Sequence, residues 1–67
     1  MSVARVTEII SSSKKSFDDA IVRGINRAAK TLKNVEGAWV KEQKVIVKSG
    51  KISEYRVDLK VTFILID

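Results

Sequence analysis

The chain has 67 residues, of which 13 are basic and 8 acidic, and its formal net charge is +5. It contains neither cysteine nor histidine, which excludes disulfides, thiolate zinc sites and the most common general base. This length predicts one domain, residues 1–67, that buries only about 60% of its unfolded surface. Because 45% of the residues are hydrophobic, we expect apolar surface beyond the needs of one small core, and therefore an oligomer.

The basic residues are spread along the chain, and their longest runs are pairs such as Lys14-Lys15. This distribution indicates a solvated, mildly basic surface and no specific nucleic-acid site. No apolar run approaches the roughly 18 residues of a membrane span, and the N-terminal residues lack the apolar segment of a signal peptide. We therefore expect a soluble, cytoplasmic protein without a membrane partner.

The first predicted element is a strand over residues 3–10, which are rich in β-branched side chains. Three consecutive serines, residues 11–13, are expected to end it, because serine side chains compete for backbone hydrogen bonds. Ser16, followed three residues later by Asp19, resembles a capping box and predicts the start of a helix.

A helix is predicted from Phe17 to a stop at Asn34, because apolar residues recur in steps of three and four. Gly24 lies on the apolar face, where it costs about 1 kcal/mol relative to alanine. Close approach of a strand to the helix would explain it. The apolar face comprises Phe17, Ala20, Ile21, Gly24, Ile25, Ala28, Ala29 and Leu32.

Residues 38–48 predict a second strand whose alternation changes phase between Val40 and Val45. A β-bulge would produce this change, and so would a strand whose two halves cover different surfaces. Ser49-Gly50 predicts a tight turn. The third strand alternates apolar and polar residues from Tyr55, and its end, Phe63–Ile66, is apolar on both faces.

Together these elements predict an α+β fold of order β-α-β-β, with a three-stranded antiparallel sheet curled around one helix. The three glycines, at 24, 37 and 50, are too dispersed to form a phosphate-binding loop. Ser11–Lys15 contains serines and lysines, but helix capping and solvated charge explain them better than a nucleophile does. We therefore expect no catalytic residue and no enzymatic activity.

Several short motifs occur in an order that resembles the dodecin family over nearly the whole chain. The most specific part is the third strand, from Tyr55 to Phe63. The matching segments are Ile9–Ser13, Ser16–Ala20, Ala29–Val35, Val40 with Glu42, Gly50-Lys51, Tyr55-Arg56-Val57, Leu59-Lys60-Val61 and Phe63. This resemblance implies a hollow shell of twelve subunits, organised as trimers; many members of the family bind flavins, which they store or quench without catalysis.

Two departures from the flavin-binding pattern concern the residues that hold the flavin. The resemblance places Gly37 where those proteins have a stacking tryptophan, and Arg56 where they have a glutamine. It therefore implies that binding of riboflavin or FMN is weak or lost. The sequence is more similar to the branch without the stacking tryptophan, such as calcium dodecin.

Trp39 is a candidate stacking surface for a ligand, because in an extended strand its side chain lies on the same face as Gly37. Gly37, Trp39 and Arg56 are thus the candidate ligand-binding residues. The alternative is that Trp39 packs at a subunit contact and Arg56 pairs with a neighbouring carboxylate such as Glu42 or Asp58.

A metal site is the other possibility, since calcium requires six to eight oxygen ligands. No acidic spacing resembles an EF-hand loop, so a site would need one carboxylate from each of several subunits. Glu36, Glu42 and Asp58 are the candidates. Two functional hypotheses follow: a shell that binds a small molecule or ion at subunit interfaces, or an assembly scaffold without a specific ligand.

Overall fold

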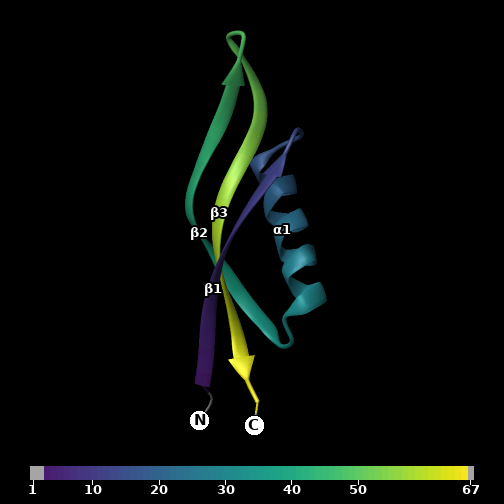
Figure 1. Cartoon of the computed structure of the whole chain (residues 1–67), viewed down its shortest axis with the longest axis vertical. Coiled ribbons are helices and arrows are strands. Elements are labelled where there is room, and N and C mark those ends of the chain that lie inside the picture. Colours follow the sequence, from purple (N-terminus) through teal and green to yellow (C-terminus); the bar gives the residue numbers. More distant parts are fainter. Residues whose placement is uncertain (1–2, 67) are drawn as a thin grey trace.

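The computed structural model describes residues 3–66 and contains the predicted β-α-β-β order. The elements are β1 (Val3–Ser13), α1 (Phe17–Thr31), β2 (Val35–Lys48) and β3 (Lys51–Leu65). The strands form one antiparallel sheet of order β1-β3-β2, so the last strand lies in the centre. Figure 1 shows α1 lying along one side of this long, twisted sheet. The predicted α+β fold is confirmed.

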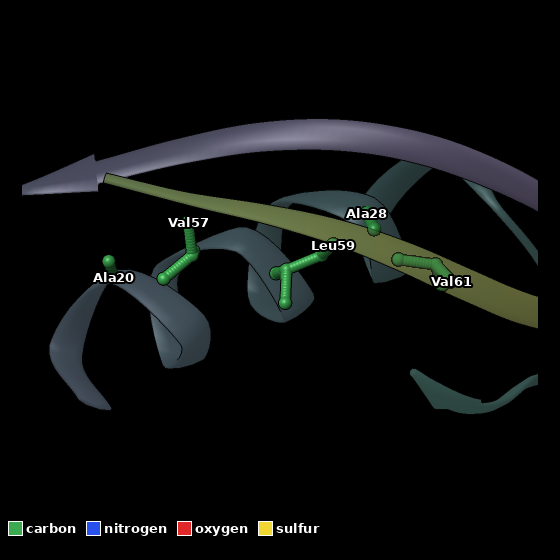
Figure 2. Close-up of a cluster of buried hydrophobic side chains, with 5 residues drawn as sticks. All are labelled: Ala20, Ala28, Val57, Leu59 and Val61. Carbon is green, nitrogen blue, oxygen red and sulfur yellow. The ribbon is translucent and has the colours of Figure 1, made fainter. Parts of the chain in front are cut away.

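The core lies between α1 and the central strand. Val57, Leu59 and Val61 alternate along β3 and are almost completely buried against Ala20 and Ala28 of α1 (Figure 2). Small helix residues allow the helix and the sheet to approach closely. This contact is tightest near the middle of α1.

Gly24 marks that closest approach, as its position on the apolar face predicted. A Cβ atom built on Gly24 would lie 2.9 Å from Leu59 Cδ1 and 3.0 Å from Ser11 Cβ. The first distance is shorter than real Cβ contacts and the second is unusually tight, so alanine at this position would force Leu59 or Ser11 to shift. Its cost in helix propensity is offset by the contact that it permits.

Two strand boundaries differ from the sequence-based expectation. β1 continues through Ser11, Ser12 and Ser13, so the prediction that the serines end the strand was wrong. They stay extended because they pair with residues 55–57 of β3. Likewise, β2 begins at Val35 and not at residue 38, since Val35 already pairs with β3.

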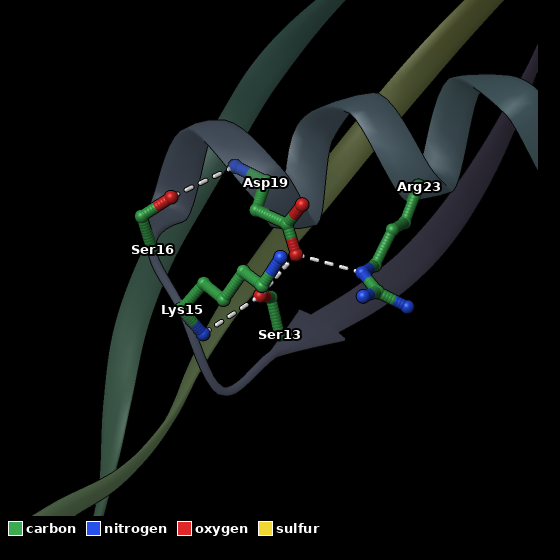
Figure 3. A network of polar contacts seen from close by, with 5 residues as sticks. All are labelled: Ser13, Lys15, Ser16, Asp19 and Arg23. Atoms are coloured by element: carbon green, nitrogen blue, oxygen red, sulfur yellow. Dashed lines mark hydrogen bonds and ion pairs between the residues drawn. The ribbon is translucent and has the colours of Figure 1, made fainter.

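Helix α1 begins as predicted, with Ser16 as the N-cap. The Ser16 Oγ accepts a hydrogen bond from the Asp19 backbone N–H at 3.0 Å. The Asp19 carboxylate does not complete a capping box; its Oδ2 accepts hydrogen bonds from Ser13 Oγ and Arg23 Nε (Figure 3). These bonds lower the pKa of Asp19, Ser13 contributing most. The carboxylate therefore ties the end of β1 to the first turns of α1.

The predicted phase change in the second strand is confirmed as a β-bulge. The register of β2 on β3 shifts between Val40 and Glu42, which leaves Lys41 as the extra residue. The predicted turn also forms, because Ser49 and Gly50 both have positive φ, of 52° and 73°. Paired positive φ values suit the tight turns of two-residue hairpins.

The sheet extends beyond the helix at both ends (Figure 1). The molecule is 50 Å long, whereas fifteen helical residues span only about 22 Å. Apolar side chains are consequently exposed on the parts of the sheet that α1 does not cover. At the hairpin they are Val45, Val47 and Ile52, and at the opposite end Val3, Leu65 and Ile66. Helix α1 itself is neither long nor apolar enough to cross a membrane.

Candidate functional site

The candidate site residues lie on the face of the sheet that is turned away from α1, which we call the outer face. Because Val57, Leu59 and Val61 face the helix, the residues between them on β3 face the other way. Their pairing partners share that face and form four rows across the three strands. From β1 through β3 to β2, the rows are Val6-Thr62-Gly37, Glu8-Lys60-Trp39, Ile10-Asp58-Glu42 and Ser12-Arg56-Lys44.

Gly37 and Trp39 lie on the same face, as the extended-strand argument predicted. Their partners, Thr62 and Lys60, are two residues apart on β3. The Trp39 side chain is 50% exposed. A Cβ atom built on Gly37 would meet no heavy atom within 4 Å, so the neighbouring position is open. This end of β2 thus offers an uncovered indole beside free space.

A shallow, largely apolar hollow of about 320 Å³ borders this segment between α1 and the edge strand β2. Ile21 and Ile25 of α1 form one side, and residues 35–40 form the other. Val40 contributes an aliphatic side chain that is 38% exposed. The hollow can accept an apolar ring or an apolar side chain from another subunit.

Arg56 lies in a different part of the outer face. Its Nε donates to Ser12 Oγ at 3.3 Å, and its Nη2 lies 3.1 Å from Glu54 Oε1. The expected pairing of Arg56 with a neighbouring carboxylate is confirmed, with Glu54 as the partner in place of Glu42 or Asp58. Glu54 is its partner because residues two apart on a strand lie on the same face.

Trp39 and Arg56 do not meet within one chain. In the register of β2 on β3, Trp39 lies opposite Lys60 and Lys44 lies opposite Arg56. The two rows are therefore four residues apart along β3. That separation corresponds to about 13 Å along the strand. A small ligand that contacts only one of these rows therefore cannot contact Trp39 and Arg56 of the same subunit at once.

Two of the three candidate metal ligands come together. Glu42 and Asp58 are direct partners on β2 and β3, whereas Glu36 lies at the first bulge of β2, between Val35 and Gly37. Like charges placed opposite each other destabilise a sheet. Such a local conflict is typical of a functional site.

Glu8 is a third acidic residue of this group that the sequence reasoning missed. It interacts with Asp58 through a side-chain hydrogen bond. Alternation in β1 could have placed Glu8 on the outer face, but only the β1–β3 register shows its neighbour. Lys41, the bulge residue, lies with its Nζ 3.5 Å from Glu8 Oε2.

The carboxyl groups influence each other's protonation. The pKa of Asp58 is raised, first by its hydrogen bond with Glu8, then by burial and by the negative charges of Glu8 and Glu42. The pKa of Glu8 is lowered, first by the same hydrogen bond and further by Lys41 and Lys60.

This acidic group does not complete a calcium site in one chain. Within residues 3–66, no three metal-ligating side chains lie close enough together to hold an ion. Asp58 Oδ1 is nevertheless buried and has no hydrogen-bond partner among the residues that the structure describes. The residues fit a calcium ion only if oxygen atoms from other subunits supply the remaining ligands.

The fold is a helix packed on a three-stranded antiparallel sheet whose central strand comes last in the chain. Together with the charged and aromatic residues on the outer face, this arrangement defines a distinct class of small proteins. The dodecin family model matches residues 3–65, and the chain belongs to the dodecin family. It is similar to calcium dodecin of Mycobacterium tuberculosis, with 39% identity over 64 residues that cover 94% of this chain and 89% of that protein.

Solved structures show the same relationship. The dodecin of Streptomyces davaonensis has a TM-score of 0.94 and 38% identity, with coverage of 98% of this chain and 97% of that one. The structure of Mycobacterium tuberculosis calcium dodecin, described as a calcium-chelating antigen with a novel calcium-binding site, has a TM-score of 0.83 and 36% identity. It covers 94% of this chain and 90% of that one. The family resemblance predicted from the sequence is confirmed.

Proposed function

We propose that this protein is a cytoplasmic, non-catalytic binding protein that assembles from trimers into a homododecamer and holds a small molecule or an ion where subunits meet. Assembly is supported by the exposed apolar residues at both ends of the sheet, such as Val47 and Leu65. Within residues 3–66 these side chains stay exposed, and contact with another chain would bury them. Family membership supports the same arrangement.

The observation that carries the binding role is the half-exposed Trp39 on the edge strand β2. A large aromatic side chain contributes both buried area and stacking, the latter worth about 0.5–1.5 kcal/mol beyond area burial. In one chain Trp39 is 50% exposed, and its segment of β2 borders an apolar hollow. At a contact between subunits, the indole would pack on a ligand or on its symmetry-related neighbours.

Paired flavin binding is proposed to be weak. Gly37 provides no ring at the position where the flavin-binding pattern has a tryptophan. Arg56 replaces the glutamine of that pattern and is held by Glu54 and Ser12. Trp39 lies two residues along from Gly37, about 6–7 Å further on the strand, which would displace any stack that it forms.

Calcium is the second candidate ligand, favoured by the pairing of Glu42 with Asp58. The buried, unpartnered Asp58 Oδ1 is an oxygen suited to a cation. The similarity to calcium dodecin supports the same ligand. We propose that Glu42 and Asp58 from neighbouring subunits contribute to such a site, whereas Glu36 lies apart from it.

Parallel titrations of the assembled protein with riboflavin and calcium test this function. We expect little quenching of riboflavin fluorescence at micromolar protein concentration. Calcium is expected to raise the melting temperature, and Glu42→Gln should abolish that rise while Glu36→Gln preserves it.

Other outcomes would change the assignment. Micromolar quenching of riboflavin that is lost in Trp39→Ala would establish a displaced flavin platform and overturn the weak-binding proposal. If neither ligand has any effect on an intact dodecamer, the binding role is wrong and the protein is an assembly scaffold.

A further inference from the structure

A second groove lies on the helix side of the sheet, between α1 and β1, which is the edge strand on the other side of β3 from β2. Its volume is about 420 Å³, and the lining includes Arg23, Arg27 and Thr31 of α1 and Thr7 and Ser11 of β1. Thr7 and Ser11 pair with the helix-facing residues of β3, so the groove lies on the helix side of the sheet, although Ile10 of the outer face also belongs to its lining. Figure 1 shows the end of β1 beside the start of α1.

The side chains of β1 alternate between the helix side and the outer face of the sheet. Thr7 and Ser11 face the helix, whereas Val6 and Ile10 face outward and are 46% and 68% exposed. Ile9 also faces the helix, and Ser11 lies against Gly24, where a small side chain is needed. The hydroxyl groups of Thr7 and Ser11 line the groove and are suited to donating hydrogen bonds to a polar ligand.

The charge in the groove has one sign. Arg23 and Arg27 are one turn apart on the same side of α1, and no acidic residue belongs to the described lining. Arg23 uses its Nε for Asp19, at 2.7 Å, so that its two Nη groups can serve another anion. Arg27 has no ion pair within residues 3–66. Guanidinium groups bind phosphate oxygens in a bidentate manner.

We propose that this groove binds the phosphate group of a small molecule. Arg27 and the Nη groups of Arg23 contact the phosphate oxygens, and the hydroxyls of Thr7 and Ser11 donate further hydrogen bonds. Ile9 and Leu32, which also line the groove, provide an apolar surface for the rest of the molecule. The proposal uses none of the residues of the outer face and is independent of the ligand proposed there.

Isothermal titration calorimetry of the full-length protein in its native assembly tests the groove. Inorganic phosphate and phenyl phosphate are titrated separately at constant ionic strength. The test variant is Arg27→Gln, and the control is Lys30→Gln, which removes the same charge from the same helix outside the groove. Circular dichroism melting confirms that both variants fold.

We expect Arg27→Gln to weaken phosphate binding about tenfold, because a charge-assisted hydrogen-bonding partner is lost, and Lys30→Gln to leave it within twofold. Tighter binding of phenyl phosphate would assign the groove to phosphate esters, and equal affinity would assign it to the free anion. Equal weakening by both substitutions would show diffuse charge attraction and overturn the proposal. So would the absence of binding to the wild-type protein at millimolar phosphate.

Discussion

Glu42 and Asp58 lie directly opposite each other on β2 and β3, two carboxyl groups facing each other across adjacent strands. Glu8 adds a third carboxyl from β1, and one Asp58 oxygen is buried without a partner. Repulsion between these groups disfavours the folded chain when all are ionised. The arrangement becomes favourable when a proton or a cation occupies it.

The first prediction concerns the pH dependence of stability. Because the pKa of Asp58 is raised in the folded chain, the folded state holds its proton more tightly than the unfolded state does. The stabilisation that protonated Asp58 contributes to the folded state is therefore present at acidic pH, and it is lost as the pH rises through the raised pKa. We expect Asp58→Asn to increase the melting temperature at pH 7 in the absence of calcium.

The control for this prediction is Glu36→Gln, which removes an acidic residue from the same sheet but outside the group. Melting curves of the three proteins should be compared from pH 4 to pH 8. The difference between Asp58→Asn and wild type should grow with pH. A lower melting temperature for Asp58→Asn at pH 7 would show that an ionised Asp58 stabilises the fold.

The second prediction concerns the contact between Gly24 and the central strand. Gly24→Ala places a methyl group 2.9 Å from Leu59 Cδ1. Overpacking of this kind costs about 1–3 kcal/mol, which exceeds the roughly 1 kcal/mol that alanine contributes to the helix. We expect net destabilisation in urea unfolding, whereas Asn26→Ala, at an exposed position of α1, should stabilise the protein slightly. Greater stability of Gly24→Ala would refute the packing argument.

The third prediction concerns the start of α1. Ser16→Ala removes the acceptor for the Asp19 backbone N–H and is expected to cost about 1 kcal/mol in the free energy of unfolding. Ser16→Asn supplies another capping oxygen and should restore most of the loss. If alanine and asparagine behave alike, the hydroxyl does not act as a cap.

The fourth prediction concerns the apolar ends of the sheet. Leu65→Lys places a charge on a side chain that is 45% exposed in one chain and that we propose is covered in the assembly. It should shift the mass in solution to smaller species. Ala29→Lys introduces the same residue at an exposed position of α1 and should leave the assembly intact. An unchanged mass for Leu65→Lys would place this end of β3 outside the interfaces.

The sequence predicted the elements whose pattern is local. Strict alternation identified β3, the spacing around Gly24 identified the helix face and its close contact, and Ser49-Gly50 identified the turn. The phase change between Val40 and Val45 correctly indicated a bulge. Each of these features depends on residues that are close together in the chain.

Features that depend on pairing between distant strands were less predictable. The serines of β1 remain extended because of their partners on β3, against their own preference for turns. Glu8 and Asp58 are fifty residues apart, so their contact requires the register of β1 on β3. A carboxylate partner for Arg56 was predicted, but several carboxylates were equally plausible neighbours, and only the structure identifies Glu54.

The most direct test of the proposed assembly is the mass of the protein in solution, measured by light scattering during size-exclusion chromatography at micromolar concentration. Twelve chains of 7.5 kDa predict a single species of about 90 kDa. A species of 7.5 kDa would contradict the assembly and, with it, a binding site formed between subunits.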